Sequence, residues 1–382
     1  MGLTAVRSNT INNVYTDPAG RFAVLDRAHG RIDRLLRADA YSAALAFIKG
    51  ELAIEGDIFS AIRFFLNQRR SNFREWWLGL CARLNSVLPQ TWTAERNIQF
   101  HYDRSNAFYS LFLDSRMQYS EAHFETAQMS LDEAQAEKLD RICRSLQLKP
   151  SERFLDIGCG WGGLIVWAAE HYGAAAHGCT LSAQQLQFAN TLIESRGLQG
   201  RVSIDLCHYL HLQRTYDKIA SVGMFEHVGR KNLSTYFRKV HSILDEGGIF
   251  LNRGIVRPEG ISDDPETLFL QRNVFPGGQL VHLADVVRES ELAGFDVIGI
   301  EDLRMHYALT CRVWVERLRS NENACEMLVG AATYRTWLLY LATSAVNFEA
   351  GVTGATQVTF LKRSANHDKL NFSSANPGRQ SR

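Results

Sequence analysis

The 382-residue sequence predicts an α/β protein in which a doubly wound, Rossmann-like sheet follows a smaller α+β unit. One reason is that strand-like and helix-like runs alternate from about residue 150 to residue 252, an order typical of parallel sheets. A second reason is a glycine-rich loop directly after the first of these strands. A third is the chain length, which suffices for one large domain and a smaller one.

The composition is that of an ordinary globular protein, with 46% hydrophobic and 22% charged residues. A formal net charge of +1 argues against a nucleic-acid partner. Seven scattered cysteines without a C-x-x-C pair predict reduced thiols in the cytoplasm and no metal site. We expect no membrane span, because no apolar run reaches about 18 residues, and no signal peptide, because residues 1–15 lack its pattern.

The two ends of the chain differ from its centre. Residues 1–18 are expected to be a flexible arm, and the polar residues 364–382 a disordered tail. Residues 19–90 are expected to form the first unit. Within it, the alternating apolar residues Leu52 and Ile54 precede a turn and an apolar helical run, which predicts a strand–turn–helix. This short segment resembles sterol-carrier-type lipid-binding modules.

A basic and aromatic segment follows at Arg69–Leu78, where arginines interleave with Phe73, Trp76 and Trp77. This pattern is typical of a helix that lies on a membrane surface. The alternative is a linker helix that packs on the main domain.

The chain changes character from about residue 98. Ser130 and Glu133 have the spacing of a capping box, which predicts a helix start. Pro150 separates this helix from a strand at Phe154–Ile157. The later strands and helices are expected at Ala174–Cys179, from Ser182, at Val202–Leu206, Ile219–Val222, Leu233–Leu244 and Gly248–Asn252.

The loop Gly158–Gly163 follows a strand and opens a helix, and its glycines allow a tight turn close to a ligand. A nicotinamide dinucleotide would need an acid at the end of the next strand, but that strand ends with Gly178–Ser182. Asp156 precedes the loop as a turn or cap residue, or as a carboxylate that meets the ammonium of an amino-acid-bearing cofactor. We favour the second interpretation, which indicates S-adenosylmethionine.

Seven segments, in order, resemble the cyclopropane-fatty-acyl-phospholipid synthase and mycolic acid cyclopropane synthase family of S-adenosylmethionine-dependent methyltransferases. They are His101–Asp114, Met117–Ser120, Leu155–Gly163, Gly178–Ser182 with Gln185, Val222–Gly229, Phe275–Gly278, and His306–Tyr307 with Trp314. Together they are far more specific than one glycine loop. The resemblance implies a class I methyltransferase core over residues 98–362.

The resemblance also implies a cofactor site. Its expected residues are Tyr119, Ser120, Asp156, Gly158, Gly160, Thr180, Leu181, Gln185 and His208. The tyrosine and serine would line the pocket, and the two glycines would lie under the amino-acid part of the cofactor. The threonine, leucine and glutamine would surround the ribose and adenine. His208 stands where the family usually has an aspartate at the adenine edge, so this contact is left open.

The family chemistry begins with a carbon–carbon double bond, a weak nucleophile that attacks the sulfonium methyl when the two are held in line. An apolar tunnel protects the resulting carbocation from water, and aromatic faces stabilise it. Loss of a proton from the new methyl closes a cyclopropane ring. Loss from an adjacent chain carbon leads instead to a methylene or methyl-branched product.

The base in the family is implied to be a bicarbonate held by Cys, Glu, His-x-Ile and Tyr. Glu226, Ile255 and Tyr307 match, but Glu121 replaces the cysteine and Arg253 the histidine. An arginine can pair with a carboxylate in a forked geometry. One hypothesis is that Glu121 replaces bicarbonate as the base; the other is a salt bridge in an altered pocket. We prefer the first, because the glutamate and tyrosine of the family remain.

The predicted reaction is methylation of an unsaturated phospholipid acyl chain, followed by deprotonation to a cyclopropane without added bicarbonate. Same-family alternatives are a methylene- or methyl-forming fatty-acid enzyme and a methyltransferase of natural-product alkenes. An alternative of another class is an inactive lipid carrier. We expect a cytoplasmic protein attached peripherally to the inner face of the membrane, and a homo-oligomer is left open.

Overall fold

The computed structural model describes residues 10–11, 14–27, 40–67, 105–126, 128–260 and 280–363. The predicted membrane segment Arg69–Leu78, the motif residues His101–Arg104 and Phe275–Gly278, and the tail 364–382 lie outside the described residues.

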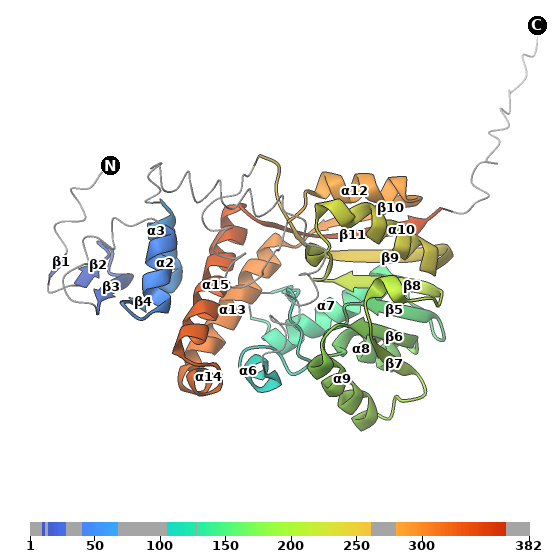
Figure 1. The fold of residues 1–382 in the computed structure, drawn as a ribbon, viewed down its shortest axis with the longest axis horizontal. Helices are drawn as coiled ribbons and strands as arrows, with labels where there is room; N and C mark the ends of the chain where they lie inside the picture. The colour runs from blue at the N-terminus through green and yellow to red at the C-terminus, as the bar shows by residue number, and fades with distance from the viewer. Residues whose placement is uncertain are drawn as a thin grey trace, which may run out of the picture.

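A seven-stranded sheet organises the larger part of the chain, in the order β10-β11-β9-β8-β5-β6-β7 (Figure 1). Its strands are β5 (Arg153–Ile157), β6 (Ala175–Thr180), β7 (Val202–Leu206), β8 (Tyr216–Val222), β9 (Leu244–Val256), β10 (Phe295–Asp302) and β11 (Gly354–Lys362). Strands β5 to β9 are parallel neighbours, whereas β11 lies antiparallel between β9 and β10. The predicted doubly wound α/β fold is therefore confirmed, with the antiparallel strand β11 and, beyond it, β10 added at one edge.

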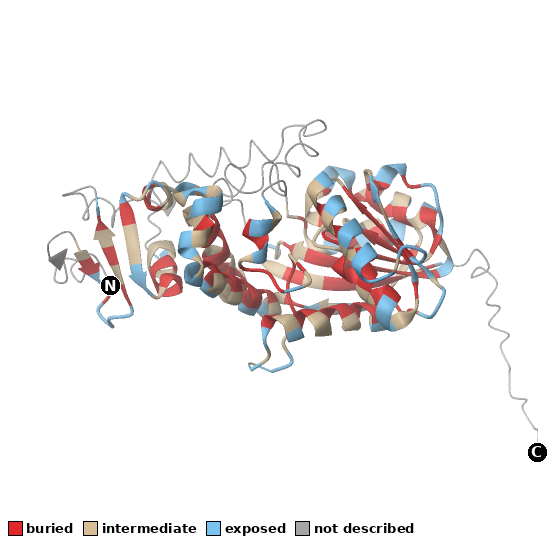
Figure 2. Ribbon diagram, turned by 90° about the horizontal axis from the view of Figure 1, so that it is seen from below, coloured by how far each residue is buried: buried red, intermediate tan, exposed pale blue. Residues whose placement is uncertain are grey.

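Helices cover both faces of this sheet. They are α7 (Leu131–Ser145), α8 (Gly163–Tyr172), α9 (Ala183–Ser195), α10 (Leu233–Ile243) and α12 (Leu283–Leu292). Successive strand residues enter different cores: Phe154 packs with α7, α8 and α9, whereas Leu155 packs with α10 and α12. This alternation is the two-residue period of a strand buried on both faces, and Figure 2 shows the strands red between helices with exposed outer sides.

The predicted capping box at the start of α7 is present. Ser130 accepts a hydrogen bond from the backbone N–H of Glu133, and the Glu133 carboxylate accepts one from the backbone N–H of Ser130. This reciprocal pair satisfies two donors at the helix start. It also orients α7, whose buried face supports the loop that leads into the site.

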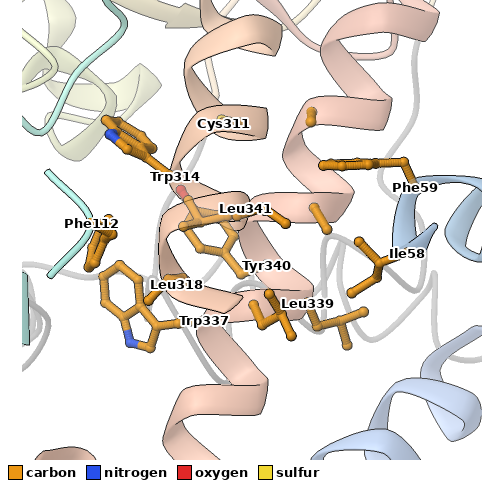
Figure 3. Close-up of a cluster of buried hydrophobic side chains, with 14 of the residues drawn as sticks. Ile58, Phe59, Phe112, Cys311, Trp314, Leu318, Trp337, Leu339, Tyr340 and Leu341 are labelled. Carbon is orange, nitrogen blue, oxygen red and sulfur yellow. The ribbon is translucent and has the colours of Figure 1, made fainter. Parts of the chain in front are cut away.

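A helical layer adjoins one end of the sheet and consists of α6 (Asn106–Ser110), α13 (Arg304–Ser320), α14 (Glu322–Val329) and α15 (Ala331–Ala350). α13 packs along α15. Figure 3 shows side chains of α15 on both of its sides, with Trp337 toward Phe112 and Leu339 toward Ile58. None of the described helices is long and apolar enough to cross a membrane.

Among the described residues, the N-terminal unit is a four-stranded antiparallel sheet with the helices α2 (Ala40–Ile48) and α3 (Ile58–Asn67), which pack on α15. Its strands are β1 (Thr10–Ile11), β2 (Val14–Thr16), β3 (Phe22–Asp26) and β4 (Leu52–Gly56). The expected strand–turn–helix is present as β4 and α3. The expectation of an arm over residues 1–18 is wrong for β1 and β2, because β2 pairs with β3 and buries Tyr15.

Candidate active site

The glycine loop connects β5 to α8 at the carboxyl edge of the parallel strands. Gly158, Gly160 and Gly162 have φ angles of 76°, 54° and 85°, a region that glycine adopts without strain. A Cβ at Gly158 would lie 2.7 Å from Cγ of Met224. The backbone therefore turns sharply here and comes close to the segment after β8.

A cavity of about 390 Å³ opens above this loop. Its lining includes all nine residues predicted for the cofactor, which are Tyr119, Ser120, Asp156, Gly158, Gly160, Thr180, Leu181, Gln185 and His208. Side chains after β6 organise one wall, where Thr180 donates a hydrogen bond of 2.7 Å to Gln185. The ligand position at the strand carboxyl ends is the one that open α/β sheets use.

Asp156 is the buried carboxylate of this cavity. Burial raises the pKa of Asp156 to about 7, and the positive charge of Lys138 opposes this effect. Its Oδ1 has no hydrogen-bond partner among the described residues. A buried acceptor without a partner is costly, and the ammonium of S-adenosylmethionine would satisfy it, so the site fits this cofactor.

Lys138 was not predicted as a site residue, although it is completely buried on α7. Its Nζ donates hydrogen bonds of 2.9 Å to Gln118 Oε1 and to Ser120 Oγ. The signal in the sequence is its place in the helical repeat, four residues after Ala134 and four before Ile142. This spacing puts the lysine on the apolar, buried face.

The second half of the site lies around Glu121, whose side chain is 1% exposed, and Arg253, whose side chain is 0% exposed. Arg253 Nε donates to Glu121 Oε1. The expected fork does not form, because Arg253 Nη1 donates instead to Gln357 Oε1 at 3.2 Å. Gln357 is the residue of β11 in register with Arg253 of β9, a contact that the sequence analysis missed.

Glu226 follows β8 in the short 3-10 turn η3 (Phe225–His227). Its Oε1 accepts the backbone N–H of Ile255 at 2.7 Å. Burial raises the pKa of Glu226 to about 7, and the nearby negative charge of Glu121 adds to this. Glu226 thus has a raised pKa and no cationic partner within the described ranges, whereas Glu121 forms an ion pair with Arg253.

Tyr307, near the start of α13, completes this group. Its ring stacks on Phe348 of α15 with centroids 4.4 Å apart. Burial raises the pKa of Tyr307 well above its usual value, and the charges of Glu121 and Glu226 contribute. The structure thus brings together Glu121, Glu226, Tyr307 and the two β9 residues Arg253 and Ile255, which come from four separate parts of the sequence.

Three polar atoms of this group lack a hydrogen-bond partner in the described part of the chain, although all are buried. They are Glu121 Oε2, Glu226 Oε2 and Arg253 Nη2. A carboxylate oxygen without a donor has a lone pair free to accept a proton. The arrangement can therefore hold a fixed base among buried side chains, next in sequence to Tyr119 and Ser120, which line the cofactor cavity.

Comparisons with known proteins agree with this geometry. The sequence profile of the mycolic acid cyclopropane synthetase family matches residues 90–358. A protein named probable fatty acid methyltransferase, from Pseudomonas putida, is 36% identical over 90% of this chain and 88% of its own length. The structure of the cyclopropane synthase MmaA2 from Mycobacterium tuberculosis matches 72% of this chain and 99% of its own, with 29% identity and a TM-score of 0.67. Mycolic acid cyclopropane synthase CmaA1, solved with S-adenosylhomocysteine and CTAB, matches 70% of this chain and 98% of its own, with 31% identity and a TM-score of 0.67.

The fold and the cavity define a class I methyltransferase that uses S-adenosylmethionine and methylates carbon. Within that class, the chain belongs to the mycolic acid cyclopropane synthetase family, since the family profile covers more than half of its length. The predicted family, fold class and cofactor are thereby confirmed.

Proposed function

We propose that this enzyme methylates the double bond of an unsaturated phospholipid acyl chain and that Glu121 then acts as the base that closes a cyclopropane ring. The observation that supports it is the buried Glu121–Arg253 pair, which leaves Glu121 Oε2 free beside Glu226 and Tyr307. The family relationship supports a fatty acyl substrate, because the P. putida relative is named a fatty acid methyltransferase.

S-adenosylmethionine supplies an electrophilic methyl group on a sulfonium. Asp156 would meet its ammonium, Ser120 its carboxylate, and the Thr180–Gln185 wall its nucleoside. These contacts would hold the methyl in line with the double bond, and such alignment accounts for much of the rate in group transfer. The carbon–carbon bond forms as the sulfur–carbon bond breaks with its electron pair passing to sulfur.

The acyl chain then carries a positive charge, and the pocket must protect it. The stacked rings of Tyr307 and Phe348 supply an apolar, electron-rich wall. Glu121 Oε2 would take a proton from the transferred methyl group. The electrons of that C–H bond close the three-membered ring and neutralise the cation.

A tethered base differs from bicarbonate in one physical respect. The guanidinium of Arg253 already neutralises a carboxylate, so a bicarbonate anion would enter a pocket with two glutamates and compete for the same cation. Burial of an unpaired anion is unfavourable. We therefore expect turnover without bicarbonate.

A second product class is favoured by the same observation. A base fixed to the chain removes whichever proton lies nearest to Glu121 Oε2, and that proton can come from an adjacent chain carbon. The electrons of that C–H bond would then form a double bond in the chain, and the product would be a methyl-branched alkene. If a hydride first shifts from the methylated carbon to the cation, loss of a proton from the methyl gives a methylene group instead. The three products have the same mass, so fragmentation of lipids from an expressing host in the mass spectrometer, which differs with the position of the ring or double bond, distinguishes them.

The test of the base is Glu121→Gln, which preserves side-chain shape and removes basicity. We expect a loss of roughly 10²–10⁴-fold in turnover, the scale of one positioned general base. S-adenosylhomocysteine affinity should change little, since Glu121 is not part of the cavity lining. The measurement is product formation in degassed buffer with and without bicarbonate, for the wild type and the variant.

Two results would contradict the proposal. One is strong stimulation of the wild type by bicarbonate, and the other is near-normal turnover by Glu121→Gln. Glu121→Cys combined with Arg253→His restores the family pair and serves as the matched control. Its turnover should become dependent on bicarbonate if the two side chains decide which base is used.

A further inference from the structure

The ammonium of Lys138 is enclosed in the protein beneath the cofactor cavity. The side chain is 0% exposed, and its two hydrogen-bond acceptors, Gln118 and Ser120, both line the cavity. Lysines are rarely buried to this extent unless they are paired. No step proposed above assigns Lys138 a role.

The contact with Lys138 determines which hydrogen-bond role the Ser120 hydroxyl can take. An ammonium has three donors and no acceptor, so Ser120 Oγ must accept the hydrogen bond from Lys138 Nζ. The hydroxyl hydrogen of Ser120 is then available to donate to an acceptor in the cavity. A carboxylate is the acceptor for which such a donor, backed by a positive charge, is best suited.

The charges around Lys138 come from several elements. Asp114 and Glu121 lie on the segment before α7, Asp156 ends β5, and Arg253 belongs to β9. Burial lowers the pKa of Lys138, and the three carboxylates oppose this. Lys138 in turn lowers the pKa of Asp156 against the effect of burial. Each group thus favours the charged form of the other.

We propose that Lys138 is a positioning residue that adapts the cavity to a zwitterionic amino-acid group, keeping Ser120 as a donor for its carboxylate and Asp156 as an anion for its ammonium. This rests on the proposed placement of S-adenosylmethionine in the cavity. The nucleoside part of the ligand lies beyond the reach of this effect, at the Thr180–Gln185 wall.

The test compares two ligands that differ only in the amino-acid part. S-adenosylhomocysteine carries it, whereas 5′-methylthioadenosine has the same nucleoside and thioether without it. Calorimetry with Lys138→Met should show S-adenosylhomocysteine binding roughly 10- to 100-fold more weakly, the scale of one hydrogen-bonded charge. Affinity for 5′-methylthioadenosine should stay within about twofold, because no charged group of this ligand depends on the lysine.

Lys218→Met is the matched control, because Lys218 is also buried but lies near the start of β8 and does not line the cavity. It should leave both affinities unchanged. Lys138→Arg, which keeps the charge, should recover part of the lost affinity for S-adenosylhomocysteine. If Lys138→Met does not fold, Ser120→Ala tests the same selective loss.

The outcomes separate this inference from the proposed function. If Lys138→Met lowers the affinity for both ligands equally, or lowers neither affinity, Lys138 does not have the proposed positioning role. If the wild type binds neither ligand, or if Asp156→Asn keeps full affinity for S-adenosylhomocysteine, the placement of the cofactor is wrong instead.

Discussion

Among the single residues, Asp156 links cofactor binding to pH. Burial raises the pKa of Asp156 to about 7, and the positive charge of Lys138 opposes this effect. The Asp156 carboxylate also contributes to the raised pKa of the nearby thiols of Cys143, Cys159 and Cys179. Below that pKa the carboxyl is protonated and cannot pair with an ammonium. S-adenosylhomocysteine affinity should therefore fall as pH decreases through about 7, approaching tenfold per pH unit.

The measurement is calorimetry between about pH 6 and pH 8. Asp156→Asn removes this carboxyl, so its affinity should be lower and should no longer fall as pH decreases; burial lowers the pKa of Lys138 to about 7, so any pH dependence left in this variant should have the opposite sign. A wild-type affinity that stays constant across the range would show that this carboxyl does not bind the ammonium.

At the scale of elements, one carboxylate on α15 connects three helices. Glu349 pairs with Arg312 of α13 at 2.5 Å and with Arg63 of α3. The Arg312 guanidinium also lies 4.1 Å above the ring of Phe59. Phe348, next to Glu349 in the chain, stacks on Tyr307, so the ion pairs lie one residue from a contact of the site tyrosine.

Glu349→Gln should lower the free energy of unfolding by about 1 kcal/mol, since the arginines are partly exposed and screened by solvent. The difference in unfolding free energy between the wild type and Glu349→Gln should become smaller in 1 M salt, because salt screens the ion pairs. Urea unfolding followed by circular dichroism measures both effects. Glu316→Gln is the control, because Glu316 is exposed on α13. Equal losses in the two variants would argue against the ionic contact.

At the scale of the whole molecule, the helical layer joins the N-terminal unit to the methyltransferase core. Figure 1 shows α13 and α15 between the N-terminal sheet and the large sheet. One hydrophobic cluster contains Phe22 of the N-terminal sheet, Trp314 of α13 and Trp161 of the cofactor loop. A continuous apolar core therefore runs from the N-terminal unit to the cofactor loop and ties the two parts of the molecule together.

Membrane attachment stays a prediction that rests on the sequence of Arg69–Leu78. The protein should bind anionic vesicles weakly and lose this binding as salt increases. Replacing Arg69, Arg70 and Arg74 together by alanine should reduce sedimentation with phosphatidylglycerol vesicles and leave S-adenosylhomocysteine affinity unchanged. Equal sedimentation of the variant would exclude an electrostatic role for these arginines.

The features predicted correctly depend on residues close together in the chain. The capping box needs only Ser130 and Glu133, and the loop after β5 needs only its glycines and the strand before it. The alternation of strands and helices is also a local pattern, so the class of fold could be derived from it. The predicted cofactor residues line one cavity because the carboxyl ends of parallel strands share an edge.

The sequence by itself determined the α/β class, the cofactor loop and the unusual residue types Glu121 and Arg253. Only the tertiary structure decided that these two pair, that Gln357 occupies the second donor of the guanidinium, and that Lys138 lies beneath the cavity. It also added β10, β11 and the first three strands of the smaller sheet, β1 to β3. The reason is physical. Arg253 meets Gln357 because β9 and β11, about a hundred residues apart in the chain, pair in antiparallel register. The pattern of apolar residues within one strand does not specify which distant strand will lie beside it.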